Sequence, residues 1–248
     1  MSRQRLVEMT VVIFGVLIAL GLENLVEEVR LRVDARRLEV AFRADILSAV
    51  RNSWERQLVA PCQARTLSAL TERAITREGG WDAAPAISNG SIVLVLPQPY
   101  RAPTRVWTTA TFDRALGSEA FKRIPRERAE TYSRLFASIE VRRELNTAEY
   151  LAISSLAPLA FSQAGIDAEV RADLLQNLSL VDRQRALALV QADQFINAAL
   201  ALEGGADIRA QILAYRSEFD RRAEQAEAGY GLCVDRSATD RLMKLAAS

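Results

Sequence analysis

The stretch that decides the fold is MTVVIFGVLIALGL, Met9–Leu22, fourteen residues without a single charge. Extended to Leu6–Val26, the segment has 21 residues. As a helix it rises about 31 Å, which is enough to cross the hydrocarbon core of a bilayer. The sequence therefore predicts a transmembrane helix as a membrane anchor over residues 1–26. We expect this helix to continue into an extracytoplasmic domain over residues 27–248.

Two small residues lie inside the apolar run, Gly15 and Ala19. They are four positions apart and so share one face of a helix. Pairs of this kind let two membrane helices approach each other closely. We therefore expect Gly15 and Ala19 to be packing residues of the anchor.

The charges around the run leave its orientation ambiguous by the positive-inside rule, because arginines lie on both sides of it. An acidic cluster follows the run directly, at Glu23, Glu27 and Glu28. Long domains also cross the membrane largely regardless of their charge. We expect a single-pass protein of a bacterial inner membrane, with its C-terminal domain in the periplasm.

A cleaved signal peptide is the competing interpretation of the same run. Ala19 and Gly21 match the small-residue pattern ahead of a cut before Leu22. Against cleavage, the pattern continues as one helix beyond the run, without a proline or a polar break.

Composition excludes several classes of function. The chain has 32 basic and 31 acidic residues, a net charge of +1, which gives no basic excess for nucleic acid. It has no histidine, which removes Ser-His-Asp triads and the commonest ligand of zinc and haem. No motif in the sequence indicates a catalytic, cofactor or metal site, and we expect a protein that is not an enzyme.

Two cysteines, Cys62 and Cys233, are too far apart for a C-x-x-C redox motif. In an oxidising compartment they would form a disulfide, which agrees with a periplasmic domain. The alternative is two unrelated thiols that are buried as small apolar groups.

After the anchor, the spacing of apolar residues predicts a long amphipathic helix over Leu25–Leu58. Its apolar positions recur at steps of four: Leu38, Phe42, Ile46, Val50, Trp54 and Leu58. Such a stripe is typical of a face that packs against other helices. Ala60-Pro61 is expected to end the helix, because proline disfavours the helical conformation of the residue before it. A second helix is then expected over Cys62–Glu78.

The rest of the chain is also predicted to be helical, apart from an irregular, Pro-rich segment over residues 79–104. Within that segment, SIVLVL (Ser91–Leu96) has the composition of a short strand. The further expected helices are Val106–Leu116, Pro125–Leu156, Asp167–Leu202 with an N-cap at Asp167, Asp207–Ala228 and Ser237–Ala246. The predicted fold class is all-α, a helical bundle with one irregular excursion.

Two stretches carry a family resemblance. The first is the anchor VVIFGVLIALGLEN with the charged helix after it, and the second is WTTATFDRALGSEAFKRIPRERAETYSRLF, Trp107–Phe136. Together they resemble bacterial single-pass inner-membrane proteins with a helical periplasmic domain. The chain departs from them in having Tyr132 and Phe136 where paired tyrosines are usual. The resemblance implies topology and a helical fold, and it implies no activity.

Two residue groups are candidates for a binding site. Aromatic residues of the second stretch could line a small-molecule pocket or belong to the core: Trp107, Phe112, Tyr132 and Phe136. Arginines after the irregular segment could hold an anion or could be solvated or ion-paired: Arg101, Arg105 and Arg114.

Two classes of function follow from these features. The first is a membrane-anchored interaction or scaffold protein, either a homo-oligomer or an accessory subunit that binds a protein partner. The second is a periplasmic sensor or a module that binds a small ligand. An apolar stripe left uncovered on the first helix would favour the first class. A large enclosed pocket with converging polar groups would favour the second.

Overall fold

The computed structural model describes residues 3–76, 99–103, 105–161, 167–202 and 206–248. Side chains are described from residue 13 on within these ranges, residues 16 and 76 excepted. The α-helices of this part are α1 (Arg3–Thr76), α2 (Ala110–Ala115), α3 (Arg126–Ser154), α4 (Ala168–Leu200), α5 (Ala206–Ala214), α6 (Arg216–Tyr230) and α7 (Ser237–Ala247). Two short 3-10 helices lie at Phe121–Arg123 and Ala157–Ala160, and the same ranges contain no strand. The all-α prediction is confirmed for them.

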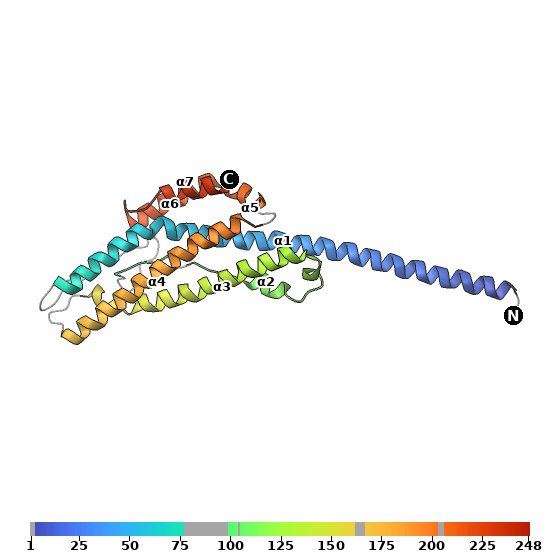
Figure 1. Cartoon of the computed structure of the whole chain (residues 1–248), viewed down its shortest axis with the longest axis horizontal. Helices are drawn as coiled ribbons and strands as arrows, with labels where there is room; N and C mark the ends of the chain where they lie inside the picture. Colours follow the sequence, from blue (N-terminus) through green and yellow to red (C-terminus); the bar gives the residue numbers. More distant parts are fainter. Residues whose placement is uncertain (1–2, 77–98, 104, 162–166, 203–205) are drawn as a thin grey trace.

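Helix α1 runs through the whole molecule (Figure 1). Its N-terminal part projects from the bundle, whereas its C-terminal part packs beside α3 and α4 (Figure 1). Helices α5, α6 and α7 cover α1 from another side. In the described part of the chain, no helix meets the length and apolarity needed to cross a membrane.

The predicted apolar stripe of the first helix forms the centre of the bundle. Its residues from Phe42 to Leu58 are almost fully inaccessible: Phe42, Ile46, Val50, Trp54 and Leu58. The ring of Phe42 contacts four other aromatic rings edge-on, with centroids 5.3–6.3 Å away. Burial of these side chains provides the main driving force for folding of this part of the chain.

The predicted helix end at Ala60-Pro61 is wrong, because α1 continues through Pro61 to Thr76. Proline has no N–H and its ring crowds the carbonyl four residues earlier, so it destabilises the helix locally. Tertiary contacts beside Pro61 offset this loss of stability. The carbonyl of Leu58 accepts a hydrogen bond from the backbone N–H of Asp235, at 2.8 Å. The helix changes direction in this half of its length (Figure 1), as expected of a proline kink.

Other helix boundaries differ from the predicted ones. Helix α2 begins only at Ala110 and is therefore shorter than the predicted Val106–Leu116. The predicted helix Asp207–Ala228 is two helices, with Tyr215 (φ −95°, ψ 18°) between α5 and α6. Such a conformation lies outside the regular helical range and redirects the chain.

The predicted N-cap of α4 is confirmed. The carboxylate of Asp167 accepts a hydrogen bond from the backbone N–H of Val170 at 2.8 Å. This bond satisfies one of the free donors in the first turn of the helix. Of the irregular segment, residues 99–103 are non-helical as expected, and the predicted strand Ser91–Leu96 lies outside the described residues.

The bundle has two hydrophobic cores separated by a buried polar layer. The larger core surrounds α1 between Ala35 and Val59, and the smaller one joins Leu67–Ala74 to the ends of α3 and α4. The buried polar layer is formed by charged side chains of α1 and α3: Arg56, Arg142 and Glu149.

Candidate functional site

The N-terminal part of α1 is an uncovered apolar surface. Every described side chain from Ile13 to Glu27 is exposed. Further along the same helix, large apolar side chains stay exposed on one face, and we call this set the α1 stripe: Leu22, Val26, Val29, Val33 and Val40. Val26 and Val40 are 69% and 60% exposed. An exposed apolar surface of this extent marks a contact with a membrane or a protein.

The α1 stripe faces away from the bundle. At about 100° per residue, Val33 and Val40 lie about 180° and 160° around the helix from Phe42. Phe42 is fully buried against the bundle, whereas Val33 and Val40 are exposed. A second helix could therefore pack on the stripe without meeting the bundle of the same chain.

Ion pairs stabilise the part of α1 where it enters the bundle. Arg32 pairs with Glu28 at 3.0 Å, and Arg37 pairs with Asp34 at 3.1 Å. Glu28 also binds Arg123 of the first 3-10 helix at 2.9 Å, which ties this part of α1 to the bundle. Exposed pairs of this spacing add a few tenths of a kcal/mol each, ~0.3–0.5. These pairs support α1 as one continuous helix from its projecting part into the bundle.

The two predicted anchor residues, Gly15 and Ala19, are exposed on the projecting part of α1. A Cβ at Gly15 would meet nothing within 4 Å among the described atoms of this single chain. Their packing role stays a prediction.

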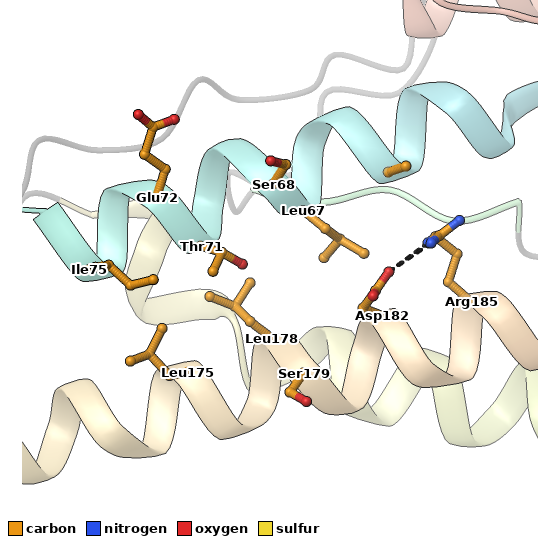
Figure 2. Close-up of a pocket in the computed structure, with 11 residues that line it drawn as sticks. Leu67, Ser68, Thr71, Glu72, Ile75, Leu175, Leu178, Ser179, Asp182 and Arg185 are labelled. Atoms are coloured by element: carbon orange, nitrogen blue, oxygen red, sulfur yellow. Dashed lines mark hydrogen bonds and ion pairs between the residues drawn. The ribbon is translucent and has the colours of Figure 1, made fainter.

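An open groove of about 710 Å³ lies between α1 and α4 (Figure 2). Figure 2 shows apolar side chains from both helices along it, among them Leu67, Leu175 and Leu178. At one end Asp182 and Arg185 pair with each other at 2.8 Å. Because this charged pair is internally satisfied and the apolar groups are spread along both helices, the groove offers no converging set of polar groups.

A smaller cavity of about 160 Å³ gathers three arginines. Its lining residues are Trp54, Glu55, Arg101, Arg105, Arg222, Gln225, Ala226, Gly229 and Tyr230. Arg105 donates two hydrogen bonds to Glu55, both at 2.6 Å, and this contact raises the pKa of Arg105. Burial raises the pKa of Tyr230 to about 12. We call this cavity the arginine cavity.

The arginine cavity combines predicted and unpredicted residues. It contains Arg101 and Arg105, whereas Arg114 lies elsewhere, with its Nε donating to the carbonyl of Ala110 at 3.0 Å. Sequence reasoning missed Arg222 and Tyr230, because α6 follows more than a hundred residues later and no local pattern connects it to Arg101.

Among the described residues, the buried polar layer holds one guanidinium with a carboxylate partner and one without. Arg56 contacts Glu149 at 2.6 Å and also donates to Asn146 at 2.9 Å. Arg142 donates to the hydroxyl of Ser53 at 3.3 Å, and its guanidinium lies 4.7 Å from the centre of the Phe195 ring. Burial, with a smaller effect from Arg56, lowers the pKa of Arg142 to about 10.

The two cysteines lie together at the bend of α1. Cys62 is buried on the helix and Cys233 lies in the turn after α6, with their sulfur atoms 2.10 Å apart and their Cα atoms 5.0 Å apart. The neighbouring bond from Asp235 to Leu58 fixes the same turn on α1. The pair therefore holds the C-terminal helices against the kink.

The aromatic candidates belong to the larger core rather than to a pocket. Phe112 stacks on Phe136 at 4.5 Å, and both rings lie beside Phe42. Trp107 and Tyr132 are buried in the same core.

Among the described residues, three or more cysteine and carboxylate side chains nowhere gather as a group that could hold a metal ion. Comparison of the chain with models of protein families, with curated proteins and with solved structures finds no match.

Proposed function

We propose that this protein is a membrane-anchored interaction protein without enzymatic activity, which self-associates through α1 and holds its helical bundle in the periplasm. Residues 1–26 form the anchor in this proposal. The apolar run Met9–Leu22 supports it, and this run begins ahead of the first described side chain. The observation that carries the proposal is the exposed α1 stripe, which continues from the apolar run towards the bundle on one uninterrupted helix.

The spacing of the stripe favours a second copy of the chain as its partner. Successive positions alternate between steps of four and three: Gly15, Ala19, Leu22, Val26, Val29 and Val33, with Val40 one heptad later. This is the a/d spacing of a two-stranded coiled coil. Valine at 26, 33 and 40 then occupies position a, where branched side chains favour parallel dimers. Arg36 falls on the remaining d position, so the apolar contact is expected to be tightest before it.

Membrane attachment is tested by fractionation of cells that make the full chain. We expect it to sediment with membranes, to resist extraction by salt and alkaline carbonate, and to dissolve in detergent. A matched variant with Leu17→Arg and Ile18→Arg should lose this resistance, because charges within the apolar run are costly in a bilayer. A wild-type chain released by carbonate would contradict the anchor.

Self-association is tested by cross-linking in the full chain. Val26→Cys and Val33→Cys place thiols on the stripe, whereas Asn24→Cys places one on an exposed face away from it. Under mild oxidation we expect covalent dimers for the first two variants and monomers for the third. Equal cross-linking of all three, or of none, would contradict the dimer even if the anchor were established.

The alternative is a periplasmic sensor or small-ligand-binding module. The arginine cavity supports it, because it is where charged groups converge in the described part of the chain. Binding of a ligand in the arginine cavity would depend neither on the anchor nor on the dimer.

A further inference from the structure

The arginine cavity lies where three segments of the chain meet: α1, the non-helical residues 101–103 and 105, and α6. Its lining contains three guanidinium groups and one carboxylate, so the charges of the lining sum to +2. The carboxylate of Glu55 is already occupied by Arg105. Arg222 is bound to Glu218 at 2.7 Å, just outside the lining.

Arg101 is the cation without a carboxylate. No acidic side chain of the described residues lies within 4.0 Å of it. Instead the Cζ atom of its guanidinium lies over the ring of Tyr230, 4.7 Å from the centroid. Guanidinium N–H groups act only as donors. Because no acidic side chain of the described residues pairs with them, these donors are available for an oxyanion.

The position of Arg101 is fixed by its surroundings. Its carbonyl accepts a hydrogen bond from the side-chain amide of Gln63 at 3.4 Å, and Ala102 and Pro103 beside it are buried. A Cβ at Gly229 would lie 3.1 Å from a guanidinium nitrogen of Arg101. Glycine at 229 therefore leaves the space that the arginine occupies.

We propose that the arginine cavity binds a small oxyanion of the phosphate class, with Arg101 as its main ligand and Arg105 and Arg222 as supporting charges. Guanidinium donors match the geometry of phosphate oxygens, and charge-assisted bonds of this kind are among the strongest in proteins. The cavity volume of about 160 Å³ is several times that of a water molecule, ~30 Å³. This volume admits a phosphate group.

The test is calorimetric titration of the purified full chain in detergent at low ionic strength. The probes are inorganic phosphate, glycerol phosphate as a lipid-headgroup analogue, and chloride. We expect saturable binding of one phosphate per chain and no saturable binding of chloride. Tighter binding of glycerol phosphate than of inorganic phosphate would identify an esterified phosphate as the ligand, and the reverse order would identify the free anion.

Variants separate specific binding from general attraction to a cation-rich surface. Arg101→Gln should weaken phosphate binding at least tenfold, whereas Arg114→Gln, outside the cavity, should leave it unchanged. Gly229→Ala should weaken binding through displacement of Arg101, so that the proposal stays testable if Arg101→Gln does not fold. Absence of saturable binding, equal binding of chloride, or equal losses in Arg101→Gln and Arg114→Gln would overturn it.

Discussion

At the scale of single residues, the polar layer between the two cores shows how one helix bundle accommodates buried charge. Arg56 and Glu149 are 7% and 2% exposed and neutralise each other. Arg142 is buried as well, but among the described residues it has no carboxylate within ion-pair distance. Its aliphatic stem and its contacts with Phe195 and Trp107 offset part of the cost of burying its charge.

The paired and the unpaired arginine should respond differently to removal. Arg56→Met leaves the carboxylate of Glu149 buried without a cation, and we expect a loss of about 3–5 kcal/mol in the free energy of unfolding. Arg142→Met keeps a stem of similar length and removes an unpaired charge, so we expect stability to be unchanged or higher. Denaturant unfolding of the full chain in detergent, followed by tryptophan fluorescence, measures both. A larger loss in Arg142→Met than in Arg56→Met would refute this account of the layer.

The raised pKa values of two tyrosines lead us to expect a loss of stability at high pH. Burial raises the pKa of Tyr230 to about 12, and burial with the nearby Glu149 raises the pKa of Tyr100 still further. In the unfolded chain both phenols ionise near pH 10. The contribution of these two groups to the free energy of unfolding is therefore fully present below about pH 10. It is lost as the pH rises through the folded pKa values.

Replacement of either tyrosine by phenylalanine should flatten this decline. The pKa of Arg142 is lowered to about 10, so this group makes the free energy of unfolding rise with pH above that value. The comparison is therefore made between the variants and the wild type. We expect Tyr230→Phe and Tyr100→Phe to lose less stability than wild type between pH 9 and pH 11, roughly one pH unit on either side of the unfolded pKa. Identical slopes in all three proteins would show that both phenols titrate normally.

At the scale of elements, α1 has two faces with opposite roles. Ile46 is fully buried, and replacement by aspartate should cost several kcal/mol, about 4 or more, because a charge would be buried without a partner. Ser48→Asp is the matched control at an exposed position of the same helix, outside the α1 stripe. Thermal unfolding of the bundle should shift strongly for the first variant and little for the second. Equal shifts would mean that the side chain at position 48 is packed in solution.

Elements that local interactions determine could be predicted from the sequence, whereas elements that depend on contacts distant in sequence could not. The buried face of α1 and the Asp167 cap follow from spacing and from local hydrogen bonds, so the sequence predicts both. Helix α1 continues through Pro61 because contacts from Cys233 and Asp235, about 170 residues later, hold the kink. No local rule contains that information.

The candidate site was predictable only in part for the same reason. Arg101 and Arg105 are neighbours in sequence and could be proposed together. Their partner Glu55 comes from α1, and Arg222 and Tyr230 come from α6. The cavity exists only once the three segments pack together.

At the scale of the whole molecule, the bridge between Cys62 and Cys233 closes a loop of 171 residues. On the chain-entropy model, a loop of this length stabilises the fold by about 5 kcal/mol. We expect a reducing agent to lower the midpoint of thermal unfolding of the wild-type chain. The variant with both Cys62→Ala and Cys233→Ala should show no response to it.

The oxidation state in the native host connects the bridge to topology. Mass spectrometry under non-reducing conditions should find the two cysteines joined in protein isolated from its own membrane. Two free thiols would argue against both the bridge and a periplasmic bundle, because thiols persist in reducing compartments.

Because α1 is continuous, it fixes how the two ends of the molecule are rotated relative to each other about the helix axis. Between Gly21 and Pro61 the helix contains no glycine or proline, so a turn at one end is transmitted to the other. One residue inserted after Val33 would rotate the bundle by about 100° relative to the anchor, whereas seven inserted residues would nearly restore the original phase. In a dimer, the first insertion would swing each bundle sideways around its partner. In the anchored protein that we propose, rotation of residues 1–26 about the helix axis would therefore set the direction in which the arginine cavity faces.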